Sequence, residues 1–246
     1  MPKIINAIIL AAGKGKRLKN FNKPKSLIVK NKKYLIENII ENFKKNKIKN
    51  ISVVTGYKSK ELVKAVKGHK VKFIFNKKWK NTNMFYSLLK ADKVLSKNYS
   101  IISYADIFYK SQAIRMLKNS KNDVSLTSYT KWKQLWKKRF SNPLLDLESF
   151  KINKDNYISE IGLKPKKYNE IKGQYMGLFA ISRNGWKKIK TIIFSNSLNI
   201  NNLSITKVLN FVIKKNVKIK ALNYSKNFFE VDFKKDLKML TKKIEK

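Results

Sequence analysis

Residues 4–18 have the sequence IINAIILAAGKGKRL, in which a continuous apolar run leads into two glycines and a basic segment. A short apolar run bounded by glycine predicts a strand that is buried on both faces of a parallel sheet. Glycine lets backbone N–H groups approach phosphate oxygens closely, and Arg17 adds a planar fork of donors. Pro24-Lys25 follows closely, so Lys25 can return to the same phosphates. The sequence therefore predicts a phosphate-binding loop after the first strand.

This loop differs from two better-known nucleotide loops. It lacks the third glycine of the dinucleotide-binding fingerprint, and no Gly-Lys-Ser/Thr closes it as in a P-loop. An ordinary glycine turn is the structural alternative. The presence of Arg17 and Pro24-Lys25 favours phosphate binding over that alternative.

The residues that follow alternate between strand and helix patterns. Apolar β-rich runs predict strands at 51–55, 71–75 and 99–104, and apolar periodicity predicts helices at 35–43, 60–66 and 82–94. Such alternation implies an α/β, Rossmann-like and mostly parallel sheet with right-handed crossovers and flanking helices.

The second half of the chain is less regular. We expect strands at 124–130, 175–181 and 217–222, a hairpin of 149–152 with 157–161, a charged connection at 132–146, and helices at 185–194, 204–214 and 236–244. We interpret residues 1–246 as one domain with a small β insertion at about 131–172.

Acidic residues are informative because only 15 stand against 57 basic ones. Asp106 follows the predicted strand 99–104, and ligands of open α/β sheets bind beyond the carboxyl ends of strands. Asp232 lies in Phe229-Glu230-Val231-Asp232 near the end of the chain. Two carboxylates that meet triphosphate oxygens are suitable ligands for Mg²⁺. The alternatives are a loop cap for Asp106 and helix capping for Asp232 and Asp236, and capping is preferred for Asp236.

The formal net charge of +42 permits two interpretations. It suits an anionic partner, including a nucleic acid, so a basic nucleic-acid-binding protein is the functional alternative of another class. However, the lysines are dispersed, and abundant Lys, Asn and Ile are typical of AT-rich codons, which favours a compositional origin.

The absence of cysteine excludes disulfides and cysteine nucleophiles. Without a membrane-length apolar run or signal-peptide pattern, we expect a cytoplasmic protein that neither enters a membrane nor binds nucleic acid.

The order of these motifs resembles the sugar-phosphate nucleotidyltransferase superfamily. The matching parts are Leu-Ala-Ala-Gly-x-Gly-x-Arg-Leu at 10–18, Pro24-Lys25, Val-Val-Thr-Gly-Tyr at 53–57, Asp106, and Glu-Val-Asp at 230–232. Residues 81–88 and 173–178 resemble the cytidylyltransferase branch that acts on phosphocholine. Residues 136–150 resemble a subgroup near capsule genes, some members of which transfer cytidylyl groups to phosphoglutamine. Ala105 departs from the glycine that the superfamily usually has before its metal-binding aspartate.

This resemblance implies a nucleotide-diphospho-sugar transferase fold and a magnesium-dependent cytidylyltransferase of capsule or surface-polysaccharide biosynthesis, with a homodimer as one expected assembly. Its partners would be CTP and a phosphocholine-like, phosphoglutamine or aminophosphonate acceptor, with a sugar 1-phosphate and another nucleoside triphosphate as the alternative. Asp106 and Asp232 would bind Mg²⁺, and Lys25 and Arg17 would be catalytic. The implied nucleotide-binding residues are Leu10, Ala11, Ala12, Gly13, Gly15, Arg17, Lys25, Gly56, Tyr57, Asn83, Ser87 and Ala105. The implied acceptor-binding residues are Asn81, Trp136, Arg139, Glu160, Gln174, Tyr175 and Glu230.

The sequence leaves the acceptor open. Trp132, Trp136 and Tyr175 could form an aromatic cage for a quaternary ammonium group, or they could simply pack. Charged and amide side chains suit a zwitterionic acceptor equally well, namely those of Arg139, Glu148, Glu160 and Gln174. Asn81, Asn83 and Ser87, at the start of a predicted helix, could bind an anion or cap the helix.

Overall fold

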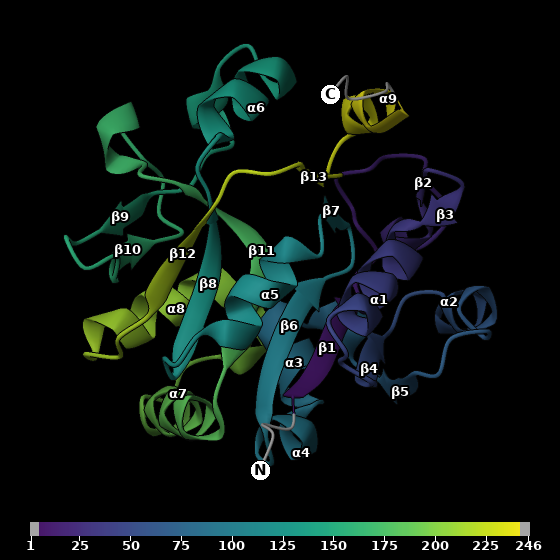
Figure 1. Ribbon diagram of the computed structural model, residues 1–246, viewed down its shortest axis with the longest axis horizontal. Coiled ribbons are helices and arrows are strands. Elements are labelled where there is room, and N and C mark those ends of the chain that lie inside the picture. Colours follow the sequence, from purple (N-terminus) through teal and green to yellow (C-terminus); the bar gives the residue numbers. More distant parts are fainter. Residues whose placement is uncertain (1–4, 242–246) are drawn as a thin grey trace.

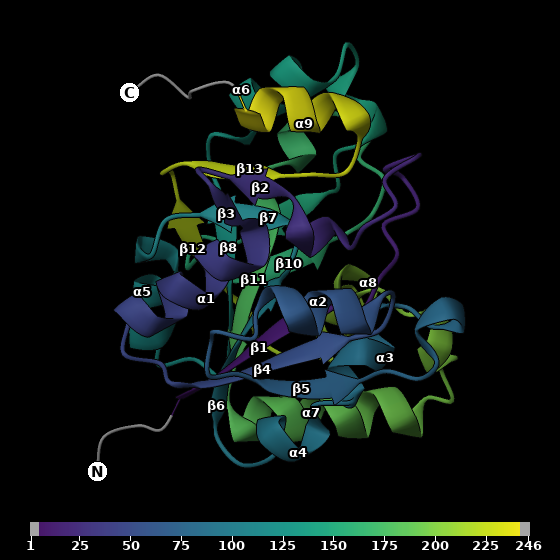
Figure 2. The same ribbon diagram turned by 90° about the vertical axis from the view of Figure 1, so that its right-hand side faces the viewer.

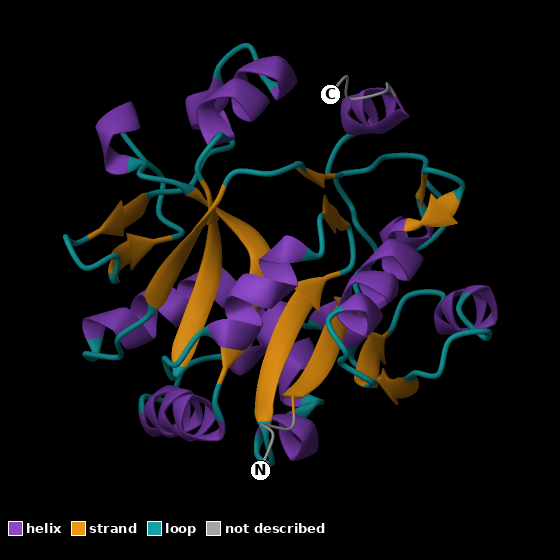
Figure 3. Cartoon of the chain, in the orientation of Figure 1, coloured by secondary structure: helices purple, strands orange, loops and turns teal. Residues whose placement is uncertain are grey.

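The computed structural model describes residues 5–241, and its centre is a seven-stranded sheet (Figures 1 and 3). The strand order is β12-β8-β11-β6-β1-β4-β5, and β11 runs antiparallel to both of its neighbours while the other pairs are parallel. The strands are β1 (Ile5–Ala11), β4 (Asn50–Thr55), β5 (Lys72–Phe75), β6 (Tyr99–Tyr104), β8 (Val124–Tyr129), β11 (Gln174–Ile181) and β12 (Lys220–Tyr224). The predicted α/β class with a mostly parallel sheet is confirmed.

Strand β1 is central because every one of its residues is buried. Side chains alternate between the two faces of a strand. Ala7 and Ile9 pack into one apolar cluster with α1, whereas Ile8 and Leu10 pack into a second cluster with α7. Full burial of one such large apolar side chain contributes about 1.5–3 kcal/mol. This two-sided core is why the opening run, residues 4–12, is apolar at every position except Asn6.

Helices cover both faces of the sheet (Figure 2). The α-helices are α1 (Leu35–Lys45), α2 (Ser59–Ala65), α3 (Met84–Leu89), α4 (Asp92–Leu95), α5 (Gln112–Asn119), α6 (Trp132–Arg139), α7 (Arg183–Ser195), α8 (Ile205–Lys214) and α9 (Lys234–Thr241). Short 3-10 helices are η1 (Lys25–Leu27), η2 (Trp79–Asn81), η3 (Pro143–Leu145), η4 (Tyr168–Glu170) and η5 (Ile200–Asn202). Within residues 5–241 no helix has the length and apolarity to cross a bilayer.

Three two-stranded ribbons complete the fold. They are β2 (Val29–Lys30) with β3 (Lys33–Tyr34), β7 (Ile107–Tyr109) with β13 (Phe228–Glu230), and β9 (Phe150–Ile152) with β10 (Ile158–Ile161). The β9–β10 ribbon is the hairpin that the sequence predicts. The β7–β13 ribbon positions the site, because it brings a segment near the end of the chain beside the end of β6.

Several local predictions were wrong. The single helix predicted at 82–94 is divided into α3 and α4, because the ψ of 15° at Ala91 interrupts the helix. The connection at 132–146 begins with α6, since burial of Trp132 and Trp136 stabilises a helical turn there. Helix α5 was not expected. The end of the last predicted helix, at 244, lies outside the described residues.

Candidate active site

The Lys25 ammonium group joins the two carboxylates that the sequence predicts as metal ligands. Its Nζ lies 2.7 Å from Asp232 Oδ1 and 3.4 Å from Asp106 Oδ2, and it donates to the Val231 carbonyl at 2.9 Å. The Lys25 side chain is 9% exposed, so this cation is held inside the protein. Three parts of the chain that are distant in sequence therefore meet at one point.

Strand ends and one short ribbon position these groups. Asp106 follows the carboxyl end of β6, beside the end of β1. Residue Glu230 pairs with Ile107 in the β7–β13 ribbon, and the Val231 N–H donates to the Asp106 carbonyl at 3.1 Å. This pairing brings Asp232 close to Asp106.

The glycine loop lies against Lys25. Gly15 has a φ of +69°, and a Cβ at this position would lie 2.6–2.8 Å from three carbons of the Lys25 side chain. Both the left-handed backbone and the close approach require glycine. Gly13 differs, because a Cβ there would meet no protein atom within 4 Å. The space in front of Gly13 is thus open to a ligand.

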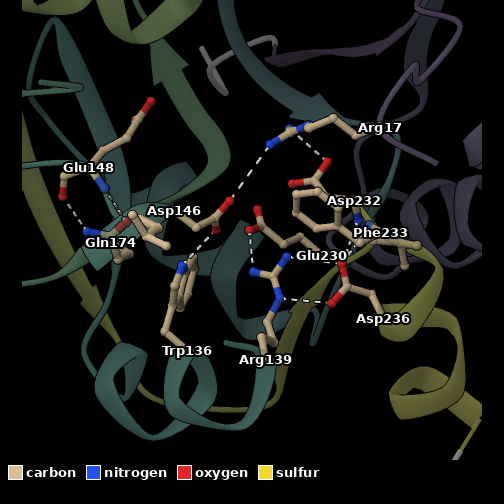
Figure 4. A network of polar contacts seen from close by, with 12 residues as sticks. Arg17, Trp136, Arg139, Asp146, Glu148, Gln174, Glu230, Asp232, Phe233 and Asp236 are labelled. Atoms are coloured by element: carbon tan, nitrogen blue, oxygen red, sulfur yellow. Dashed lines mark hydrogen bonds and ion pairs between the residues drawn. The ribbon is translucent and has the colours of Figure 1, made fainter. Parts of the chain in front are cut away.

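Arg17 extends from this loop toward two carboxylates (Figure 4). Its Nη2 lies 2.8 Å from Asp232 Oδ1, and its Nη1 lies 4.0 Å from Asp146 Oδ1. The Arg17 side chain is 58% exposed. It can therefore exchange these partners for an incoming anion at little cost in burial.

Two adjacent pockets open at this edge of the sheet. The first encloses about 280 Å³, and its lining residues are Leu10, Ala11, Gly13, Gly15, Lys16, Arg17, Lys25, Ser26, Met84, Tyr104, Ala105, Asp106 and Asp232. The second encloses about 120 Å³ and is lined by Leu10, Ala12, Gly13, Trp79, Thr82, Asn83, Met84 and Ser87. They share Leu10, Gly13 and Met84, so one elongated ligand could occupy both.

The buried side-chain amide of Asn76 fixes two residues that line the smaller pocket. Asn76 is fully buried, and its Nδ2 donates to Ser87 Oγ at 3.1 Å and Thr82 Oγ1 at 3.2 Å. Asn83 accepts from the Met84 N–H at 2.7 Å and so caps α3, although it also lines the pocket. Asn81 lies on the exposed end of η2 and lines neither pocket.

Gly56 and Tyr57 support the glycine loop from behind. The Tyr57 N–H donates to the Ala12 carbonyl at 2.9 Å, and the Tyr57 hydroxyl donates to Asn22 at 3.2 Å. Neither residue lines the two pockets described above. Their predicted contact with a nucleotide remains a prediction.

Burial and neighbouring charges shift the pKa values of these groups. Burial raises the pKa of Asp106, and although Lys25 opposes this shift, the charge of Asp232 adds to it. Burial disfavours the charged form of Lys25, but Asp106 and Asp232 outweigh that effect and raise its pKa. Lys25 is therefore a cation, and the two neighbouring carboxylates favour its charged form.

A wider set of carboxylates surrounds Tyr104. Burial raises the pKa of Tyr104, and the charges of Glu148, Asp106 and Glu230 add to that shift. Burial also raises the pKa of Glu230 to about 7, and although Arg139 opposes the shift, the charge of Asp232 adds to it. The negative potential therefore extends beyond the two candidate metal ligands.

Two predicted acceptor residues, Trp136 and Arg139, make contacts within the protein (Figure 4). Arg139 is completely buried and paired with Asp236 and Glu230. Trp136 is 3% exposed, and its Nε1 donates to Asp146 Oδ2 at 3.0 Å. Their burial disfavours direct contact with an acceptor, and the predicted acceptor role of these two side chains stays a prediction.

The amide of Gln174 and the carboxylate of Glu160 also bond to other groups of the protein. Gln174 Nε2 donates to the Glu148 carbonyl at 2.6 Å, so this side chain fixes the backbone of residue 148. Glu160 lies on the β9–β10 hairpin and pairs with Lys151 at 3.1 Å. Tyr175 packs edge-on against Tyr104, and its hydroxyl is buried.

Sequence reasoning missed several contributors. Lys16, Ser26, Met84, Tyr104, Trp79 and Thr82 line the pockets, and Asn76 and Asp146 organise them. Ser26 was detectable because it directly follows Lys25; its Oγ is buried and makes no hydrogen bond within residues 5–241. No sequence pattern pointed to Asn76, because its role depends on side chains that only the fold brings near it.

The residues present fit a magnesium ion that is shared with phosphates. Asp106 and Asp232 already bind one cation, the Lys25 ammonium, between them. Among residues 5–241, no group of three or more His, Cys, Asp or Glu side chains is arranged to hold a metal ion. Mg²⁺ commonly uses one or two carboxylates and completes its shell with phosphate oxygens and water. Two carboxylates beside a phosphate loop match that requirement.

Comparison with known proteins shows the family to which this chain belongs. The family described as the MobA-like NTP transferase domain matches residues 7–149. The CTP:phosphoglutamine cytidylyltransferase of Campylobacter jejuni is 34% identical over 255 residues, which cover 97% of this chain and 100% of that protein.

Solved structures share the fold. The CTP:phosphocholine cytidylyltransferase of Streptococcus pneumoniae has a TM-score of 0.73 and 21% identity, over 98% of this chain and 99% of that one. The inositol-1-phosphate CTP transferase of T. maritima has a TM-score of 0.74 and 18% identity, over 99% of this chain and 98% of that one. At such identities the likeness shows the fold alone, which is the nucleotide-diphospho-sugar transferase fold that the sequence predicts.

Proposed function

The chain belongs to the MobA-like NTP transferase family, and we propose that this nucleotidyltransferase moves CMP from CTP to a small phosphorylated amino acid of the phosphoglutamine type. One observation carries the proposal: Lys25 Nζ contacts both Asp106 and Asp232 at the mouth of a glycine-loop pocket. A fixed cation and paired carboxylates beside exposed backbone donors are what a triphosphate needs.

The chemistry is an in-line phosphoryl substitution. An anionic phosphate oxygen of the acceptor forms a bond to the α-phosphorus of CTP, and the bond from that phosphorus to the α,β-bridging oxygen breaks as pyrophosphate leaves. The attacking oxygen is already deprotonated near neutral pH, so no general base is required. Catalysis then consists of positioning and charge stabilisation.

This chain's own residues supply those effects. The backbone around Gly13 and Gly15 would receive the triphosphate, and Arg17 would leave Asp232 for a phosphate oxygen. Lys25 would stabilise the negative charge that develops at the α-phosphate. Asp106 and Asp232 would hold Mg²⁺, which when bound neutralises phosphate charge.

The smaller pocket is proposed to receive the cytosine base. It opens from the glycine loop through Leu10, Gly13 and Met84, so a base held there would be joined to a triphosphate at that loop. Ser87 and the N-terminus of α3 present polar groups there.

Charge favours an acceptor that carries an ammonium group. Of the 15 acidic residues in a chain of net charge +42, six gather here, namely Asp106, Asp146, Glu148, Glu230, Asp232 and Asp236. Asp106 and Asp232 are proposed to hold Mg²⁺, and Arg139 pairs with Glu230 and Asp236, so Asp146 and Glu148 remain to attract an ammonium group.

The arrangement of aromatic rings favours an amino acid over choline. Trp132 stacks on Tyr168, Trp136 lies under Arg139, and Tyr175 packs on Tyr104. These rings contact different partners and do not enclose one space, as a cage for a quaternary ammonium group requires. The similarity to the C. jejuni relative supports the same choice.

A pyrophosphate-release screen tests the proposal. Each of the four common nucleoside triphosphates is combined with phosphoglutamine, phosphocholine, aminoethylphosphonate and glucose 1-phosphate. We expect the highest kcat/KM for CTP with phosphoglutamine. Preference for phosphocholine would contradict the acceptor, preference for a sugar phosphate with another nucleotide would support the sugar-nucleotide alternative, and no release with any pair would reject the function.

A further inference from the structure

Arg139, at the end of α6, is a buried cation with three engaged nitrogens (Figure 4). Its Nε and Nη2 donate to Asp236 Oδ1 and Oδ2 at 3.0 and 3.1 Å, and its Nη1 donates to Glu230 Oε1 at 2.6 Å. The side chains of Arg139 and Asp236 are both 0% exposed. The rings of Trp136 and Phe140 lie 5.0 and 5.1 Å from the guanidinium carbon. This guanidinium is therefore held rigidly.

Asp236 connects that guanidinium to the backbone of Asp232. Its Oδ2 accepts from the Asp232 N–H at 2.9 Å and from the Phe233 N–H at 2.8 Å. Both N–H groups lie just ahead of α9 and Asp236 is the third residue of that helix, so its side chain makes the back-bond of a capping box, in keeping with the predicted capping role. The Asp236 carboxylate could cap the helix without a further partner. The two parallel hydrogen bonds from Arg139 also fix its orientation.

Arg139 holds the chain on both sides of Asp232. Glu230 lies two residues before it and Asp236 four residues after it, and both are bonded to Arg139. Between these anchors, Asp232 Oδ1 reaches Lys25 Nζ at 2.7 Å and Arg17 Nη2 at 2.8 Å. Any shift of Arg139 would move the carboxylate that meets Asp106 across Lys25.

We infer that Arg139 and Asp236 are a positioning pair that holds the Asp232 carboxylate in place for the Mg²⁺–nucleotide complex. The inference rests on the proposed function, because it assigns Asp232 to that complex. A buried ion pair is often no more stabilising than an apolar pair of equal volume, so stability alone explains this arginine poorly. Residues that orient a metal ligand typically change metal affinity by about 10–100-fold when substituted.

The variants Asp236→Asn and Arg139→Lys test this pair. Their affinity for CTP is measured by calorimetry, once with Mg²⁺ and once with EDTA. Both changes keep the size and part of the hydrogen bonding of the original side chain. We expect Mg²⁺-dependent affinity to fall about 10-fold or more in each variant. Binding in EDTA should stay at the wild-type value, because the glycine loop is untouched.

Asp92→Asn is the matched control. Asp92 accepts from Trp186 Nε1 at 2.7 Å and pairs with Lys190 at 2.7 Å, and it starts α4 at the opposite end of the molecule (Figure 1). This variant should lower the melting temperature and leave Mg²⁺-dependent binding unchanged.

Two outcomes would overturn the inference: a folded Asp236→Asn or Arg139→Lys protein with wild-type Mg²⁺-dependent affinity, or an equal loss in Asp92→Asn. If Asp236→Asn does not fold, Arg139→Lys decides alone, since it retains the charge. Wild-type protein without Mg²⁺-dependent CTP binding would instead contradict the proposed function, so the two failures are distinguishable.

Discussion

Lys25 and Asp232 are 207 residues apart in the sequence, yet Lys25 Nζ lies 2.7 Å from Asp232 Oδ1. The same ammonium group reaches Asp106, so one cation bridges the two candidate metal ligands. Because Lys25 also lies against Gly15, the contact joins the phosphate loop to the carboxylates. The proposed chemistry depends on this junction.

Replacing Lys25 with alanine should reduce kcat strongly. The ammonium group would stabilise charge that develops at the α-phosphate, and loss of one strong donor of this kind costs about 3–4 kcal/mol, or about 10²–10³-fold in rate. Steady-state pyrophosphate release would measure it. Lys23→Ala, at an exposed position two residues away, is the control, and near-normal turnover of Lys25→Ala would reject the role.

Asparagine at either Asp106 or Asp232 should abolish activation by Mg²⁺. Each change removes one of the two carboxylates proposed to hold the ion, and we expect a fall in kcat/KM of about 10²-fold or more, because a catalytic metal contributes several kcal/mol. A magnesium titration of activity measures the effect. Asp155→Asn, in an exposed turn, should behave like wild type. Unchanged magnesium dependence in both site variants would remove these residues from the metal site.

Two alanine substitutions in the glycine loop should separate stability from binding. Gly15→Ala places a side chain at φ +69° against the Lys25 stem and should cost about 1–3 kcal/mol of unfolding free energy. Gly13→Ala meets no protein atom within 4 Å, so stability should be retained while CTP binding weakens. Urea unfolding and calorimetry give the two quantities. Wild-type affinity in Gly13→Ala would show that the space before Gly13 is not the phosphate site.

Asn76→Ala should weaken CTP binding through the base pocket. The change removes the donor to Ser87 and leaves the Lys78 N–H without its acceptor, at a cost of about 1–3 kcal/mol. Asn122→Ala, which loses a hydrogen bond from Tyr157 far from this pocket, is the control. Fluorescence titration with CTP should show a higher Kd in Asn76→Ala only. Equal Kd values in the two variants would place the base elsewhere.

DNA binding should be weak and non-specific despite the net charge of +42. Dispersed lysines give only the general electrostatic affinity, with Kd values of about 10⁻⁴–10⁻⁶ M at physiological salt and a steep fall as salt increases. Anisotropy titrations at several salt concentrations measure this. Much tighter binding at physiological salt would favour the nucleic-acid-binding alternative.

Most of the sheet follows from local patterns. The strands β1, β4 and β6 are short, mostly apolar and β-branched runs that are buried almost throughout, as parallel strands covered on both faces must be, so composition is sufficient to find them. Helix α6 was not predicted because its lysine-rich exterior hides two buried tryptophans. Its stability comes from tertiary packing, to which a local pattern is insensitive.

The sequence by itself predicted that the glycine loop, Lys25 and Asp106 would lie together, because parallel strands end at one edge of a sheet, and the structure places them in contact. Only the tertiary structure decided that Arg139 binds Asp236 and Glu230. That pairing depends on burial and on partners about a hundred residues away, and a buried guanidinium must be paired wherever the fold places carboxylates.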